Sequence, residues 1–220
     1  MKNLASVALC GLAILALACA SAVTAPKPAV VPTQWELGFT FQQATPIRLQ
    51  IPGDKAPSTF WYVPYTVTNQ TPDEQTFVPE LVLYTDTGQI LHAGKNVPSF
   101  VFTAIQKEIN EPLLKDQAAV SGPLLRGANN AKQGVMIFTD IDPEAGSFDI
   151  FVGGLSGETV KIEPPNPVGV ERWVDGNKRL EMKSEVFLSK TLQLHYSLAG
   201  EAAARFTTLP VLESKTWVMR

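Results

Sequence analysis

Four acidic side chains stand close together between two apolar runs, and their type and spacing could bind a metal ion. Asp140, Asp142, Glu144 and Asp149 occur in the stretch VMIFTDIDPEAGSFDIFVGGL, residues 135–155. Calcium takes about six to eight oxygen ligands, often several carboxylates that converge from one loop. Asp140 and Asp142 would share a face if the first strand continued through both, and Glu144 and Asp149 would approach them if the connection folded back.

The same residues can also be interpreted as an ordinary turn. The stretch lacks the regular acidic spacing and the distal glutamate of an EF-hand calcium loop. Asp142 precedes Pro143, and Glu-Ala-Gly follows, which is common turn chemistry. The sequence therefore favours a turn between two core strands and keeps the four carboxylates as candidate metal ligands.

Other residue types that carry catalysis form no recognisable motif. The only histidines, His92 and His195, lack the H-x-x-x-H spacing of a zinc site. No serine lies in G-x-S-x-G, and no glycine-rich phosphate loop is present. We therefore expect a non-catalytic protein without a cofactor. The alternative is a hydrolase-type enzyme whose site is assembled from scattered Asp, Glu and His side chains.

Residues 1–20 have the pattern of a secretory signal. Lys2 supplies a positive start, residues 7–18 form a short apolar run, and small residues follow. The run is shorter than the roughly 20 apolar residues that a membrane-spanning helix needs. The sequence predicts an exported protein, located in the periplasm, at the cell surface or outside the cell.

Two ways of processing this signal remain open. Small residues on both sides of residues 19 and 21 fit cleavage and free secretion. Alternatively, ALAC, residues 16–19, resembles the lipobox of bacterial lipoproteins, which makes Cys19 the lipidated residue. That motif usually has Leu, Val or Ile where this chain has Ala16. In this second case the protein contacts the membrane through its lipid anchor.

Cysteine and charge content exclude several kinds of function. Cys10 and Cys19 both lie in the signal segment, so the remaining chain has no disulfide, no thiol nucleophile and no cysteine metal site. The chain has 18 basic and 21 acidic residues and no basic stripe. We therefore expect no nucleic-acid partner, because such binding depends on neutralising phosphates.

Beyond the signal, the sequence predicts a linker and one β-rich domain. Residues 21–33 contain Pro26, Pro28 and Pro32 among small residues, which favours an extended linker. Residues 34–220 show repeated period-2 alternation, as in residues 35–42, and frequent turn signals. This pattern indicates a mainly β protein, an antiparallel β-sandwich with one short helical connection.

Particular elements can be placed along this domain. Apolar residues at four-residue spacing predict a helix over about 99–110, with Ser99 as its N-cap. A second helical turn around residues 113–119 is left open. Residues 77–91 read as a hairpin, and Asp-Gly at 175–176 indicates another. Pro64 interrupts a strand and predicts an edge position or a bulge there.

Large aromatic side chains are expected in the core of such a domain. The four tryptophans are Trp35, Trp61, Trp173 and Trp217. Trp173 is the candidate for exposure and ligand stacking, because a proline-rich segment precedes it.

The chain resembles uncharacterised exported bacterial proteins with an immunoglobulin-like sandwich. The resemblance rests on YTVTNQT, LVLYTDTG, FTDIDPEAG with FVGGLSG, and the terminal KTWVMR. These are strand and turn patterns that contain no catalytic residues, so they imply fold and envelope location only. The function we expect is binding or scaffolding of an envelope protein or glycan, with a purely structural lipoprotein as a further alternative.

Overall fold

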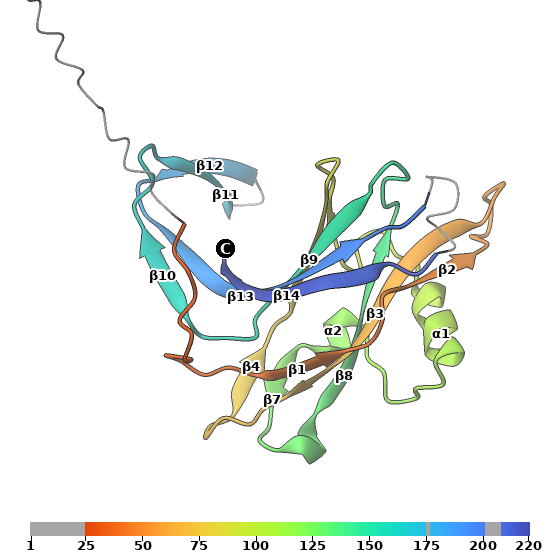
Figure 1. The fold of residues 1–220 in the computed structure, drawn as a ribbon, viewed down its shortest axis with the longest axis horizontal. Helices are drawn as coiled ribbons and strands as arrows, with labels where there is room; N and C mark the ends of the chain where they lie inside the picture. Colours follow the sequence, from red (N-terminus) through yellow and green to blue (C-terminus); the bar gives the residue numbers. More distant parts are fainter. Residues whose placement is uncertain (1–24, 175–176, 201–207) are drawn as a thin grey trace, which may run out of the picture.

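The computed structural model describes residues 25–174, 177–200 and 208–220 and is mainly β (Figure 1). The strands are β1 (Gly38–Phe41), β2 (Thr45–Leu49), β3 (Ser58–Thr68), β4 (Gln75–Phe77), β5 (Glu80–Thr85), β6 (Ile90–His92), β7 (Gly122–Leu124), β8 (Lys132–Thr139), β9 (Ser147–Gly153), β10 (Thr159–Ile162), β11 (Val168–Val174), β12 (Asn177–Lys183), β13 (Val186–Ser197) and β14 (Val211–Met219). Two α-helices, α1 (Ser99–Glu108) and α2 (Gln117–Val120), and a 3-10 turn over Ala128–Asn130 complete the described elements. The prediction of a mainly β chain with antiparallel sheets is confirmed. The structure has two α-helices where the sequence predicted one and left a second helical turn open around residues 113–119, and α2 is that second turn.

The first large sheet is built around β3. This strand pairs antiparallel with β1 and β2 on one side and with β8 on the other. The predicted edge position of Pro64 is therefore wrong, because β3 is central. The carbonyl of Pro64 accepts a hydrogen bond from the backbone N–H of Gln42, at the break between β1 and β2. Main-chain nitrogen and carbonyl of one strand residue face the same side, so the missing donor of Pro64 faces this break rather than β8.

The second large sheet has the order β10-β13-β9-β5-β6, with β14 on the other edge of β13. The predicted hairpin over residues 77–91 is right for β5 and β6, which pair with Leu83 opposite Leu91. Phe77, however, belongs to β4, which pairs with β7 in a separate two-stranded sheet. The terminal KTWVMR pattern lies at the end of β14, whose last residue is Met219.

One core lies between the two large sheets. Phe148, on β9, stacks on Tyr196 of β13 at 5.1 Å between ring centroids and meets Trp61 of β3 edge-on at 6.1 Å. Trp61 is buried, while Trp35 and Trp217 are partly buried and pack against the same core. The side chain of Trp173 lies outside what the structure describes, so its predicted exposure stays a prediction.

Helix α1 covers the other face of the first sheet. Val101 and Ile105 of α1 are fully buried and share a second apolar cluster with Phe60 of β3 and Ile137 of β8. The predicted helix is thus confirmed, although it ends at Glu108 and its N-cap position is Pro98 rather than Ser99. Helix α2 is capped by Asp116, whose carboxylate accepts from the N–H of Ala119 at 2.8 Å. No helix in the described part of the chain is long and apolar enough to cross a membrane.

A thinner region extends from the second sheet. We call residues 159–174 and 177–189 the arm; it contains β10, the hairpin β11–β12 and the first four residues of β13. The remaining described elements form the body. In Figure 1 the arm lies on the left, and the β11–β12 hairpin arches over the end of β14. Val174 pairs with Asn177, as the Asp-Gly signal predicts, and the two turn residues themselves lie outside the described residues.

Candidate functional site

Three of the four acidic residues, Asp140, Asp142 and Glu144, lie at the crossing from one sheet to the other. Strand β8 belongs to the first sheet and β9 to the second, and residues 140–146 join them. The first strand does not continue through Asp140 and Asp142: β8 ends at Thr139, and Asp140 has a left-handed φ of 58°. Asp140 and Asp142 therefore do not share a strand face.

Hydrogen bonds within this crossing build a turn. The carboxylate of Asp142 accepts from the N–H of Glu144 at 2.9 Å, and its carbonyl accepts from Ala145 at 3.0 Å. A hydrogen bond from Thr87 and the one from the Glu144 backbone lower the pKa of Asp142. The side chain of Gln89 bridges the Asp140 carbonyl and the Asp142 N–H at 2.7 and 2.9 Å.

Asp149 lies apart from this turn, on the outer face of the second sheet. Its carboxylate is 2.9 Å from Nδ1 of His195, which is its cross-strand neighbour on β13, and it accepts from Gln193 at 3.0 Å. The His195 side chain is 38% exposed, and His92 is exposed as well. Asp149 and His195 form a polar cross-strand pair on an open face. The hydrolase alternative, which needs a nucleophile and an oxyanion site beside such a pair, stays a prediction.

Metal binding at these carboxylates also stays a prediction. Within residues 25–174, 177–200 and 208–220, no group of three or more His, Cys, Asp or Glu side chains is placed to hold a metal ion. Cys19 and the signal segment 1–20 lie outside the described residues, as does the start of the predicted linker.

A cluster of charged residues that sequence reasoning missed lies where β9 leaves the edge of β13. After Gly153 the chain turns toward the first sheet, where Leu155 accepts from the N–H of Leu37 at 2.8 Å. It returns at Glu158, whose carbonyl accepts from the N–H of Lys190 at 2.9 Å. The side chain of Lys190 is buried beside this excursion.

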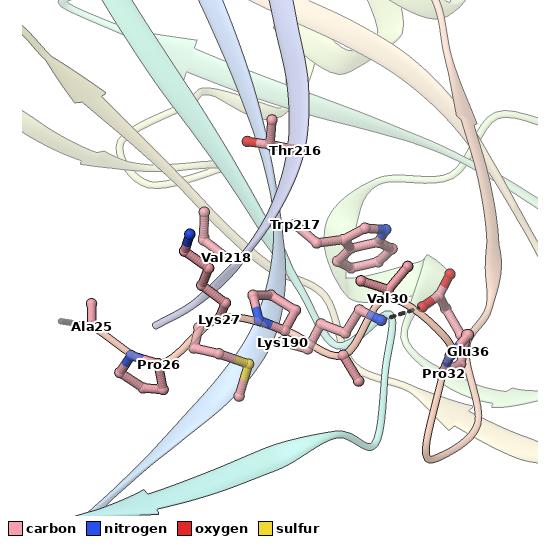
Figure 2. Close-up of a pocket in the computed structure, with 13 residues that line it drawn as sticks. Ala25, Pro26, Lys27, Val30, Pro32, Glu36, Lys190, Thr216, Trp217 and Val218 are labelled. Carbon is pink, nitrogen blue, oxygen red and sulfur yellow. Dashed lines mark ion pairs between the residues drawn. The ribbon is translucent and has the colours of Figure 1, made fainter.

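Lys190 is only 2% exposed and has two acidic partners, Glu36 and Glu158. Figure 2 shows its ion pair with Glu36. Its Nζ lies 2.9 Å from a carboxylate oxygen of Glu36 and 3.4 Å from one of Glu158. It also lies 5.1 Å from the ring centroid of Trp217. Burial by itself lowers the pKa of Lys190, but the hydrogen bonds and charges of Glu36 and Glu158 outweigh it and raise the pKa. The raised pKa favours the cation, which is the form that pairs with the two carboxylates, over the neutral amine that a nucleophilic lysine needs.

The N-terminal segment runs beside this cluster. A cleft of about 670 Å³ lies between residues 25–32 and the chain around Lys190 and Trp217. Glu158 accepts from the N–H of Ala29 at 2.8 Å, so one carboxylate contacts both Lys190 and the segment. The geometry suits a structural clasp between β13, the excursion and the N-terminal segment. The alternation along β13 could have revealed the burial of Lys190, because Lys190 lies on the same inward-facing side of the strand as Leu192, Leu194 and Tyr196.

The arm carries a different surface, which is apolar and open to solvent. Exposed fractions are 68% for Leu180, 60% for Met182, 68% for Phe187 and 42% for Val168. All seven residues of β12 are exposed. A cleft of about 570 Å³ lies at the base of the hairpin, lined by Val170 and residues 182–187. Such a group of exposed apolar side chains is typical of an interaction surface.

Comparison with known proteins gave no match: no protein-family model, no curated protein and no solved structure is similar to this chain.

Proposed function

We propose that this chain is an exported, immunoglobulin-like β-sandwich protein that binds another protein at the cell envelope through its arm. The observation that carries this proposal is the set of exposed apolar side chains on the arm, with Leu180 and Met182 on β12 and Phe187 on β13. Apolar side chains favour a protein partner over a glycan, because exposed apolar area is stabilised by burial against another apolar surface.

The hairpin itself supports a binding role. Among the described residues, β11 and β12 pair only with each other. A two-stranded hairpin without a packed face is marginally stable in water. Each strand of this hairpin has seven residues. A partner that packed against the hairpin would supply the missing packed face along that length and stabilise it.

Export is the second part of the proposal. It rests on the signal pattern of residues 1–20, and an exported chain would carry the arm into the envelope. Incorporation of labelled palmitate that Cys19→Ala abolishes would establish the lipid-anchored form. Release of a shorter chain without label would establish free secretion.

Photo-crosslinking in an exporting bacterium tests the binding role. A photoreactive amino acid at position 180 should give a discrete crosslinked protein in the envelope fraction. The matched control is position 113, because Leu113 is 74% exposed but lies on the body. Equal labelling from both positions, or none from position 180, would contradict the proposal.

A further inference from the structure

We propose that the body has a second binding site, where an extended peptide adds antiparallel to the free edge of β14. The peptide is one in which apolar and acidic side chains alternate. The site is the cleft of about 670 Å³ between residues 25–32 and the end of β14 (Figure 2). Its volume is within the roughly 300–1,000 Å³ of ligand-binding pockets. Its lining residues belong to the body, so this inference goes beyond the proposed function of the arm and does not depend on it.

The main-chain groups along one edge of β14 have no partner strand. The N–H of Ser189 donates to the carbonyl of Arg220 at 2.7 Å, and the N–H of Arg220 donates to that of Ser189 at 3.0 Å. The register between β13 and β14 is regular from Met219 to Ser214. Direction alternates along a strand, so Met219 and Trp217 direct their N–H and C=O groups away from β13. Within the described residues β14 pairs with β13 alone, which leaves these groups as a template for strand addition.

The cleft lies along this free edge rather than on one face of the strand. Successive side chains of a strand point to opposite faces. The cleft is lined by all of residues 216–219, so it reaches both faces of β14 and the edge between them. A peptide in the cleft can therefore bind the outward main-chain groups of Trp217 and Met219.

The segment on the other side of the cleft does not fill this edge itself. Pro26 and Pro28 have no N–H to donate to a sheet. The N–H of Ala29 is already donated to Glu158 at 2.8 Å. Residues 25–32 thus form a wall of the cleft and leave the edge of β14 open to another chain.

The walls of the cleft favour apolar side chains on the peptide. Pro26, Pro28 and Val30 line it from the N-terminal segment. Trp217 and Met219 line it from β14 and point to the same face of that strand. In an antiparallel pair, facing residues have their side chains on the same face. The peptide residues that face Trp217 and Met219 are therefore expected to be apolar.

One cation of the cleft favours acidic side chains at the alternate positions. Lys190 is paired with Glu36 and Glu158. Lys27 is exposed, lines the cleft and has no ion pair within the part of the chain that the structure describes. A carboxylate on the peptide would supply that partner. A peptide in which apolar and acidic side chains alternate therefore suits both walls and charge.

Binding of methylated peptides tests the strand addition. The probe is a fluorescent eight-residue peptide of alternating valine and glutamate with blocked ends, and the protein is the full chain made in a bacterial host. Fluorescence anisotropy should show saturable binding. Methylation of the valine nitrogens removes the donors that face β14 and should weaken binding by about tenfold or more. Methylation of the glutamate nitrogens is the matched control, because those N–H groups face away from β14, and it should leave binding nearly unchanged.

Substitutions at Met219 make the same comparison on the protein. Met219→Pro removes an N–H that points away from β13, so the pairing of β14 should survive while peptide binding falls by about tenfold or more. Met219→Ala shortens the same side chain but keeps the N–H, and should bind the peptide almost as well as wild type. Thermal unfolding checks that both variants fold. If Met219→Pro fails to fold, the two methylated peptides still decide the question.

Charge exchange tests the choice of acidic side chains. Lys27→Glu should weaken binding of the valine–glutamate peptide by up to about fivefold, as expected for an exposed ion pair. A peptide of alternating valine and lysine should bind Lys27→Glu better than it binds wild type. The same affinity of wild type and Lys27→Glu for both peptides would remove Lys27 from the site and contradict the acidic preference.

The remaining outcomes decide the inference as a whole. No saturable binding, or equal binding of the two methylated peptides, would overturn it. Dimers of the wild type in sedimentation that Met219→Pro abolishes would assign the edge to a second copy of this chain and would also overturn it. Photo-crosslinking from position 180 reports on the arm alone, so the proposed function and this site can fail separately.

Discussion

The body and the arm of this molecule are built from similar strands, but among the described residues only the body has a second layer to pack against. In the body, Phe148, Ile150 and Val152 alternate along β9 and are at most 1% exposed, because the first sheet covers them. In the arm, Leu180 and Met182 alternate along β12 in the same way and remain largely exposed. Alternation therefore predicts a strand with two different faces, but it does not reveal what covers the apolar face.

The ion pairs of two lysines also differ in exposure between the two regions: the one in the body is buried and the one in the arm is exposed. Lys190 of the body is enclosed with Glu36 and Glu158. Lys161 of the arm pairs with Glu185 at 2.5 Å, but both side chains are more than 40% exposed. Exposed pairs contribute about 0–1 kcal/mol, whereas removing one member of a buried pair costs several times more. Substitutions matched between body and arm can test this difference.

The largest effect is expected from truncating a ring. Phe148→Ala removes the stack on Tyr196 and leaves a cavity between the sheets, so the free energy of unfolding should fall by about 3–5 kcal/mol. Phe187→Ala, at a position that is 68% exposed, should change it by no more than about 0.5 kcal/mol. Urea unfolding of both variants measures the difference. Similar losses would mean that the arm is packed in solution as tightly as the body.

Removing a lysine should show the second difference. Lys190→Met leaves the carboxylates of Glu36 and Glu158 close together without their cation, and should cost about 3–5 kcal/mol. Lys161→Met should cost about 0–1 kcal/mol. Equal and small losses in the two unfolding curves would contradict the clasp assigned to Lys190.

The pH dependence of the clasp follows from the raised pKa of Lys190. A group whose pKa is higher in the folded state contributes stability that is fully present below its unfolded pKa, about 10.4 for lysine. That contribution is lost as pH rises through the folded pKa. The difference in unfolding free energy between wild type and Lys190→Met should therefore be constant at neutral pH and shrink above about pH 10.4. A difference that already shrinks below neutral pH would point to another group.

The mainly β class, the α1 helix and the hairpins could be predicted from the sequence because each depends on local pattern. The central position of β3 could not be predicted. Pro64 fits in a central strand because the neighbouring chain on one side is interrupted between β1 and β2, which pair separately with β3. The end of β8 was missed for a similar reason. Asp140 adopts a left-handed conformation that Gln89, about fifty residues earlier in the chain, stabilises through its side chain.

The candidate sites were harder to predict than the fold. Nearness in sequence suggested one acidic cluster, but the strand ends before Asp142, and Asp149 lies on β9, where it pairs with His195 of the neighbouring strand β13. Lys190 contacts Glu36, which lies more than 150 positions earlier in the chain. Only the place of Lys190 on the inward-facing side of β13 could therefore have indicated that its side chain is buried. Exposure of Leu180 depends on the absence of a covering layer, which no local pattern encodes.

A smaller effect is expected from two glycine substitutions that again compare body and arm. Gly154 has a φ of 81°, and a Cβ there would collide with the backbone carbonyl of Val78. Gly154→Ala should therefore cost about 1–3 kcal/mol or more, because backbone cannot easily move aside. In the arm, a Cβ on Gly169 would lie 2.9 Å from the end of the exposed Leu180 side chain, which can rotate away. Thermal unfolding should show a clear loss for Gly154→Ala and a much smaller one for Gly169→Ala.

The smallest effect on stability should accompany the largest effect on association. Leu180→Lys replaces a 68% exposed side chain, so the unfolding free energy of the monomer should change by no more than about 0.5 kcal/mol. In the proposed complex of the arm with its envelope partner, the same substitution places an unpaired charge in the apolar contact and should abolish capture of that partner. Leu113→Lys, at a similarly exposed position on the body, should leave both properties unchanged. A Leu180→Lys variant that still captures the partner would move the contact to another surface, whereas one that unfolds the body would show that the arm is part of its core.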